Sequence, residues 1–398
     1  MENIKENIKT EVESHRAELL RLSHQVHDRP ELGLKEYYAV ERTRALLENC
    51  GYSVNVGIGG LETAFMATKE GRPGGVHVAF LAEYDALPEI GHGCGHNVIL
   101  TCAVGAFLGM AAAMDGLCGR VSLIGTPGEE NAAGKVTLLE QHIFDDVDFA
   151  LMIHPSSGPS LIHRGGRACT DMGVTFRGKS AHSSVPATGI NALSAVIATF
   201  NHIDLMRPTF AMQDNINGII TEGGTARNVI PDHTACEFCL RAQTLLELEA
   251  LVEKVKKAVE CASALTGATA EVEVGAMYAE RYTCLPVCEA FKANMESLGE
   301  PMEYPDPNGM LGSSDVGNVS IKLPAIHDYL SIAPAEVNGH SRELADAAAS
   351  PRADEVCIRG AQGLAMTAAD LFSSEALRTQ AKEYHEKTVP AEYKKRGQ

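Results

Sequence analysis

The 398-residue sequence is short of basic residues and has no apolar run long enough to cross a membrane. Lysine and arginine total 34, against 52 aspartates and glutamates, so the formal net charge is −18. A chain this acidic is not expected to bind nucleic acid or an anionic membrane surface. The longest apolar run, residues 98–114, is shorter than the ~20 residues that a membrane-spanning helix needs, so we expect a buried core helix there.

The sequence also lacks the signs of a secreted, disulfide-bonded protein. Its eleven cysteines are odd in number and scattered, and the N-terminal residues MENIKENIKT contain no apolar signal core. Both features predict reduced thiols and a cytoplasmic location. No G-x-S-x-G motif occurs, so the sequence does not support a serine hydrolase with a nucleophile elbow.

The length of the chain predicts two domains, or one domain with a large insertion. In the first part, residues 1–168, apolar spacing predicts helices at 4–26, 36–50 and 98–114, and strands at 52–56, 62–68, 76–82, 121–125 and 149–153. This alternation predicts an α/β domain with a mostly parallel sheet covered by helices. In such a domain the ligand site lies at the carboxyl ends of the strands.

The middle of the chain has a different order of elements. Residues 169–281 read as β-α-β-β-α-β, which predicts an inserted two-layer α/β sandwich with an antiparallel sheet. Residues 282–398 are expected to complete the first domain. They contribute a GSSD loop at 312–315, a strand at 328–332 and helices from Ser341 onward.

The segment 81–96, LAEYDALPEIGHGCGH, holds the densest group of candidate metal ligands. It follows a buried strand and brings His92, Cys94 and His96 within five residues. Imidazole and thiolate bind zinc-like metals, and glycine lets the backbone fold closely around an ion. A single histidine or cysteine in a loop is usually structural, but several ligand types at one strand end favour a metal site. Alternatively, Cys94 could act as a nucleophile, which would need a base more distant than His96.

Further candidates follow the next strands. Glu129 and Glu130 are adjacent, so one can bind a metal while the other faces a water, as a metal-assisted hydrolase requires. Two solvated surface glutamates are the ordinary alternative. His154 follows an apolar strand and could be a core histidine, and His340 precedes a helix and could belong to its cap.

Several long motifs, in order along almost the whole chain, carry a family resemblance. They are AEYDALPEIGHGCGHN, GTPGEENAAGKV, LMIHP, GKSAHSSVP with GINAL, NGIITEGGTARNVIPD, GSSDVGNVS and NGHSRE. The chain resembles the aminoacylase/carboxypeptidase-type dinuclear metallopeptidases, in their amidohydrolase branch. That branch includes indole-acetyl-amino-acid hydrolases, aminobenzoyl-glutamate hydrolase and β-alanyl-lysine dipeptidase.

The resemblance implies roles for ten residues of this sequence. The implied ligands of two divalent ions, zinc or manganese, are Cys94, His96, Glu130, His154 and His340. Glu129 is implied to be the general base, and Asp85 to orient a ligand. The inserted domain is implied to contribute His182, Asn228 and Arg241 to the substrate, and to form a homodimer in which His182 reaches the partner's site.

This sequence departs from the family pattern at two positions. Glu83 stands where the wider family has histidine, which is typical of the branch. Asn97 stands where many members have aspartate, as in the dipeptidase-like members.

These observations predict metal-dependent hydrolysis of an amide bond in a small N-acyl amino acid or dipeptide. Metal-activated water would attack the carbonyl, with Glu129 as base, and Arg241 would suit a substrate carboxylate. The alternative is a catalytically inactive relative that keeps the fold and binds a peptide or an amino acid.

Overall fold

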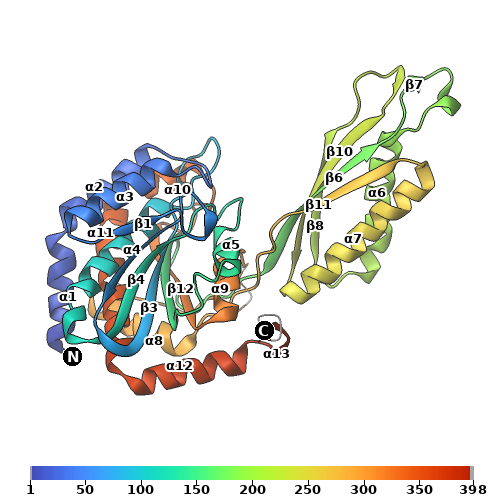
Figure 1. The fold of residues 1–398 in the computed structure, drawn as a ribbon. Coiled ribbons are helices and arrows are strands. Elements are labelled where there is room, and N and C mark those ends of the chain that lie inside the picture. Colours follow the sequence, from blue (N-terminus) through green and yellow to red (C-terminus); the bar gives the residue numbers. More distant parts are fainter. Residues whose placement is uncertain (1, 308, 310, 395–398) are drawn as a thin grey trace. The chain divides into compact units, whose positions relative to one another are not determined.

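The computed structural model describes residues 2–307, 309 and 311–394. The chain divides into two compact units, one made of Met1–Gly166 with Arg281–Gln398 and the other of Arg167–Glu280 (Figure 1). The second unit is therefore an insertion in the first.

The first unit is built on a six-stranded sheet with the order β1-β2-β4-β3-β5-β12. β3 pairs in parallel with β4 and β5, and β12 pairs in parallel with β5, while β1 and β2 form an antiparallel edge. The expected mostly parallel sheet is therefore confirmed. The strands are β1 (Val54–Val56), β2 (Phe65–Glu70), β3 (Arg72–Ala82), β4 (Cys118–Gly125), β5 (Phe149–Ser157) and β12 (Ala325–Ala333).

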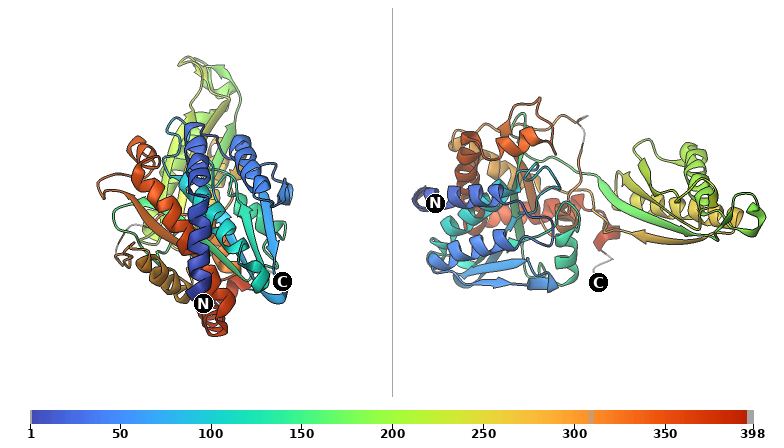
Figure 2. Two further views of the ribbon diagram at one scale, coloured as in Figure 1. Left: turned by 90° about the vertical axis from the view of Figure 1, so that its left-hand side faces the viewer. Right: turned by 90° about the horizontal axis from the view of Figure 1, so that it is seen from above.

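Helices cover both faces of this sheet. One apolar core joins α1, α2, α4, α8 and α11 to the sheet, and a second joins α5 and α9 to it. The left view of Figure 2 shows α1, in dark blue, beside α11, the C-terminal helix that it contacts. The helices are α1 (Glu2–Ser14), α2 (Arg16–Asp28), α3 (Tyr37–Asn49), α4 (His96–Ala111), α5 (Gly134–Glu140), α8 (Leu285–Ser297), α9 (Val316–Lys322), α10 (Arg342–Ala347), α11 (Pro351–Ser373), α12 (Glu375–Thr388) and α13 (Ala391–Lys394).

Two expected helices differ in their bounds. The helix expected at 4–26 is two helices, α1 and α2, which meet at His15. Apolar residues keep their spacing across the break, so periodicity alone does not reveal it. The helix expected at 98–114 is α4, which starts at His96, and every one of its residues is buried. No helix among the described residues has both the length and the apolarity to cross a membrane.

The second unit is a four-stranded antiparallel sheet with the order β11-β6-β10-β8. α6 and α7 pack against this sheet in one apolar core, and Figure 1 shows both helices on one face. Residues of β10 alternate between buried and more exposed positions, as expected of a strand covered on one side. The elements are β6 (Ala168–Arg177), α6 (Ala192–Met206), β8 (Asn215–Glu222), β10 (His233–Ala242), α7 (Leu245–Thr266) and β11 (Thr269–Val274).

A separate two-stranded ribbon extends the second unit and was not expected from the sequence. It pairs β7 (Ala181–His182) with β9 (Val229–Ile230) in antiparallel register. The segment before it, GVTFRGKS at 173–180, has the spacing of a phosphate-binding loop. Most of that segment lies within β6, so it forms no loop around a phosphate.

Candidate metal centre

The predicted metal ligands come together at the carboxyl ends of the parallel strands of the first unit. Two groups of potential ligand atoms, each within 4.8 Å, share the sulfur of Cys94. One group is completed by His96 and His154, and the other by Glu130 and His340. All five predicted ligands are therefore close enough to surround two ions with a thiolate between them.

The donor atoms at this edge of the sheet suit bound cations. His96 Nε2, Glu130 Oε1 and Glu83 Oε2 are buried and have no hydrogen-bond partner among the described residues. A buried polar atom without a partner is costly, and a coordinated cation would satisfy it. Thiolate and imidazole favour zinc, while carboxylates also suit manganese, so the residues fit a site for divalent ions of this kind.

Asp85 connects two of the candidate ligands. His96 Nδ1 donates to Asp85 Oδ1 at 3.0 Å, and the backbone N–H of Glu130 donates to Asp85 Oδ2 at 2.9 Å. Although burial alone would raise the pKa of Asp85, the contact with His96 outweighs it and the pKa is lowered. The ionised carboxylate thus holds the His96 ring so that Nε2 faces the other ligand candidates.

His154 is held by its own strand. Its Nδ1 donates to the carbonyl of Pro155 at 2.6 Å, which leaves Nε2 as the acceptor nitrogen. Burial, followed by the nearby His96, lowers the pKa of His154 to about 3. The ring is therefore neutral near neutral pH, which is the state that binds a metal.

The backbone around these ligands adopts unusual conformations. Gly95 has a φ of 74°, and a Cβ at this position would lie 2.5 Å from Pro155 Cγ, so only glycine fits between Cys94 and His96. His340 has a φ of 56°, in the left-handed region that non-glycine residues seldom occupy. Its N–H donates to the carbonyl of Gly93 at 3.1 Å, so the backbone links the two ligand-bearing loops.

Glu129 lies beside the ligand candidates, in a third group of potential ligand atoms with Glu83 and His96. Its side chain is buried, and burial raises its pKa well above the usual range, with the carboxylates of Glu83 and Glu130 adding to the effect. A carboxylate that holds a proton this readily is suited to general base catalysis near neutral pH.

A buried lysine that the sequence analysis did not identify completes the centre. Lys135 Nζ lies 2.5 Å from Glu83 Oε1 and 2.7 Å from Asp315 Oδ1, and all three side chains have no exposed surface. Burial lowers the pKa of Lys135, but the Asp315 and Glu83 carboxylates outweigh it and the pKa is raised, so the ammonium stays protonated. Lys135 and Asp315 lie in the motifs GTPGEENAAGKV and GSSD, but nothing in the sequence indicates that residues so far apart pair.

Two other residues of the metal loop have different surroundings. Asn97 Nδ2 donates to Ser23 Oγ and to the Ala348 carbonyl, both at 2.9 Å, so this side chain joins helices. His92 is buried and stacked on His27, and it belongs to none of the ligand groups found among the described residues.

The other predicted site residues belong to the second unit. His182 and Asn228 lie near each other at one end of the β7–β9 ribbon, because His182 ends β7 and Asn228 directly precedes β9. There the N–H of Ser183 donates to the Asn228 carbonyl at 3.0 Å. Both residues are exposed, and Nδ1 of His182 lies 2.8 Å from Ser184 Oγ. Arg241 lies on β10 opposite Cys169 and is half-buried.

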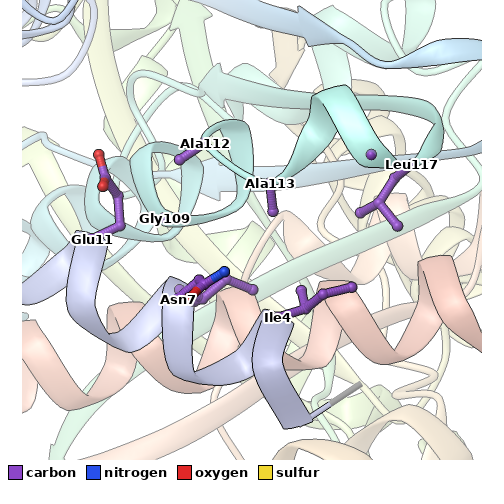
Figure 3. Close-up of a pocket in the computed structure, with 9 residues that line it drawn as sticks. Ile4, Asn7, Glu11, Gly109, Ala112, Ala113 and Leu117 are labelled. Carbon is purple, nitrogen blue, oxygen red and sulfur yellow. The ribbon is translucent and has the colours of Figure 1, made fainter.

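A hollow of about 420 Å³ lies elsewhere in the first unit, between α1 and the end of α4 (Figure 3). Among the described residues that line it, Glu11 is the only carboxylate, beside Asn7 and small or apolar residues. Gly109 in its wall lies thirteen residues along α4 from His96, about 20 Å along the axis. The hollow is therefore not part of the metal centre.

Comparison with known proteins places the chain among metal-dependent peptidases. Residues 165–264 match a family model described as a peptidase dimerisation domain. A human protein named Xaa-Arg dipeptidase is 35% identical over 379 residues, covering 89% of this chain and 86% of the relative. An Escherichia coli protein, named as one of the subunits of p-aminobenzoyl-glutamate hydrolase, is 29% identical over 68% of this chain and 60% of the relative.

Solved structures show the same fold. A putative aminohydrolase from Staphylococcus aureus superposes with a TM-score of 0.76 at 18% identity, over 93% of this chain and all of that one. A Bacillus subtilis structure, described as a dinuclear metal-binding peptidase of the M20 family, gives a TM-score of 0.63 at 20% identity, over 87% of this chain and 98% of that one. With the 35% identity to the human dipeptidase along most of both chains, these findings show that the chain belongs to the M20 family of metallopeptidases.

Proposed function

We propose that this M20 enzyme is a dipeptidase that uses two divalent ions, zinc or manganese, to hydrolyse the amide bond of a small dipeptide. One observation carries the proposal: two groups of potential ligand atoms share Cys94 and lie beside the proton acceptor Glu129. Cys94, His96 and His154 would hold one ion, and Cys94, Glu130 and His340 the other. Bound there, the ions would supply Lewis-acid activation of the amide carbonyl and of the attacking water.

Two residues beside the proposed ligands have separate roles in the reaction. Glu129 takes a proton from the attacking water and returns one to the leaving amine. Asp85 fixes the ring of His96 and the backbone of Glu130, so that both ligands keep their direction.

The second unit would bind the substrate. Arg241 would pair with the substrate carboxylate, because a guanidinium can donate two parallel hydrogen bonds to it. Asn228 and His182 share the exposed β7–β9 ribbon. In a homodimer formed through this unit, His182 would donate to the oxyanion in the partner's site.

Dipeptides that end in arginine or lysine are the substrates to test first. The basis for arginine is the 35% identity to the human Xaa-Arg dipeptidase over most of both chains. Lysine is included because the motifs also resemble those of β-alanyl-lysine dipeptidase. N-acyl amino acids are the second class, because a Bacillus subtilis relative named N-acetylcysteine deacetylase is 26% identical over 64% of this chain. The acidic composition and eleven free thiols support a cytoplasmic location.

The test is a hydrolysis screen on purified protein with defined metal content. Protein loaded with zinc or manganese should release free amino acid from Xaa-Arg or Xaa-Lys dipeptides, and chelator-treated protein should not. The matched control is Glu129→Gln loaded with the same metal. Binding of dipeptides without hydrolysis, in wild-type protein shown to hold metal, would instead support a non-catalytic binding relative.

A further inference from the structure

Lys135 is an unusual residue to find beside a metal centre, because it places a fixed positive charge among carboxylates. It lies in the first turn of α5, Glu83 directly follows β3, and Asp315 is the N-cap residue of α9. The Lys135 ammonium contacts both carboxylates, and the Lys135 backbone N–H also donates to Asp315 Oδ2 at 3.0 Å. Three separate segments of the first unit are therefore joined at one buried cation.

Glu83 faces two ways within this arrangement. Its Oε1 contacts Lys135, while its Oε2 lies 3.5 Å from His96 Nε2 and has no hydrogen-bond partner among the described residues. With His96 and Glu129 it forms a third group that could hold a metal ion. This group competes with the group of Cys94, His96 and His154, because both need His96.

We propose that Lys135 is a positioning residue of the metal centre: its ammonium holds Glu83 and Asp315, and so keeps divalent ions out of the Glu83–His96–Glu129 group. Lys135 thereby restricts the ions to the two groups that share Cys94, and keeps Glu129 as a base rather than a metal ligand. The inference rests on the proposed function, since it assumes the ligands named there.

The physical basis is competition between two cations for one carboxylate. An ammonium at hydrogen-bond distance from Glu83 Oε1 neutralises that carboxylate and repels a second cation at the same position. Removing the ammonium would leave Glu83 and Asp315 buried without a cation to balance their charge, and the backbone N–H of Lys135 would remain only for Asp315, which is strongly unfavourable. A divalent ion bound by Glu83, His96 and Glu129 would relieve that cost.

The experiment compares metal binding by wild-type protein, Lys135→Met and a control. Methionine keeps most of the length of the side chain and removes its charge. Lys322→Met, which removes a half-exposed lysine 3.4 Å from Asp145, is the matched control. Chelator-treated proteins are titrated with zinc or manganese by calorimetry, and metal per subunit is counted by mass spectrometry.

We expect the wild type and Lys322→Met to bind two equivalents with the same affinities. In Lys135→Met one of the two equivalents should bind about tenfold or more tightly, because an ion held by Glu83, His96 and Glu129 replaces the ion that needs His96 in the group with Cys94 and His154. Unchanged or weaker binding of both equivalents in Lys135→Met, when circular dichroism shows it to be folded, would overturn the inference. Wild-type protein that binds no metal would instead refute the proposed function.

Glu83→Gln and the double variant Glu83→Gln/Lys135→Met keep the inference testable if Lys135→Met does not fold. Both should bind two equivalents with affinities within threefold of the wild type, since Glu83 is not a ligand in this account. Loss of one equivalent in Glu83→Gln would show that Glu83 binds a metal, and would overturn the inference.

Discussion

In the first unit four of the five side chains proposed to bind metal are buried or half-buried, whereas in the second unit two of the three proposed substrate-binding residues are exposed. The first unit brings its donor atoms within 4.8 Å of each other through loops of its own sheet. The second unit presents His182 and Asn228 on an exposed ribbon, and its edge strand β8 carries exposed apolar residues such as Ile219. Metal binding should therefore depend on one unit, and substrate binding on contacts that the second unit makes.

Replacing the general base should have the largest effect. We expect Glu129→Gln to lower kcat by about 10³-fold or more, because proton transfer by a positioned side chain contributes about 10²–10⁴-fold. Metal content should stay at the wild-type level, since Glu130 is the proposed ligand. Steady-state kinetics and metal analysis would check this. If Glu129→Gln loses one metal equivalent while Glu130→Gln retains both, Glu129 is the ligand and Glu130 the base.

Replacing the exposed histidine of the second unit should come next. We expect His182→Ala to lower kcat by about 10²–10³-fold, the effect of losing one oxyanion donor, with metal content unchanged. His233→Ala removes another histidine of this unit and is the control. Mixing His182→Ala with Glu129→Gln should restore activity if sites are shared between subunits. Verified heterodimers that remain inactive would contradict a shared site.

Asp85 should act on metal affinity more than on the fold. Asp85→Asn weakens the hold on His96 and the backbone of Glu130, so we expect metal affinity to fall by about 10–100-fold. Competition with a chelating dye would measure this. Asp354→Asn is the control, because Asp354 makes a similar contact with His24 at 2.8 Å, away from the centre. If Asp85→Asn binds metal as tightly as Asp354→Asn does, Asp85 does not position the ligands.

The smallest expected effect is on the pH dependence of the protein's stability. Glu36 is buried, accepts hydrogen bonds from Thr63 Oγ1 and the Gly128 N–H, and has its pKa raised by burial to about 7. Because the pKa of Glu36 is higher in the folded than in the unfolded protein, the folded protein binds more protons between about pH 4.5 and 7. The stability that Glu36 contributes is therefore complete below pH 4.5 and is lost as the pH rises through 7.

Because of Glu36, we expect the free energy of unfolding of the wild type to fall by about 3 kcal/mol between pH 4.5 and pH 8. Glu36→Gln should lack that loss, whatever its stability at pH 5. Thermal unfolding of both proteins across this range would measure the difference. The control is Glu62→Gln, which removes an exposed carboxylate of the same region. Parallel stability curves for Glu36→Gln and the wild type would contradict the prediction.

Much of this architecture could be predicted from local patterns. Apolar runs followed by turn residues indicate the parallel strands, and the motifs after them indicate which strand ends carry Cys94, Glu130 and His154. The break at His15 escaped prediction because the apolar spacing continues through it. The two-residue strands of the β7–β9 ribbon are too short to show alternation.

The contacts that could not be predicted join distant parts of the chain. Lys135 and Asp315 lie 180 residues apart, and only the packing of α5 beside α9 brings them together. Asn97 occupies a position that suggests a ligand, but its side chain donates to Ser23 and Ala348 instead. A charged or polar residue in a motif therefore does not reveal by itself whether it faces the ions or supports the surrounding structure.

The central claim is that two ions share the sulfur of Cys94, and metal counting in two variants tests it most directly. Wild-type protein should hold two equivalents per subunit. His340→Ala should lose one, because His340 belongs to only one of the two groups. Cys94→Ala should weaken both, so that neither equivalent survives dialysis conditions under which His340→Ala keeps one. If Cys94→Ala retains two equivalents and full activity, the thiolate is not a ligand and the account of the centre is wrong.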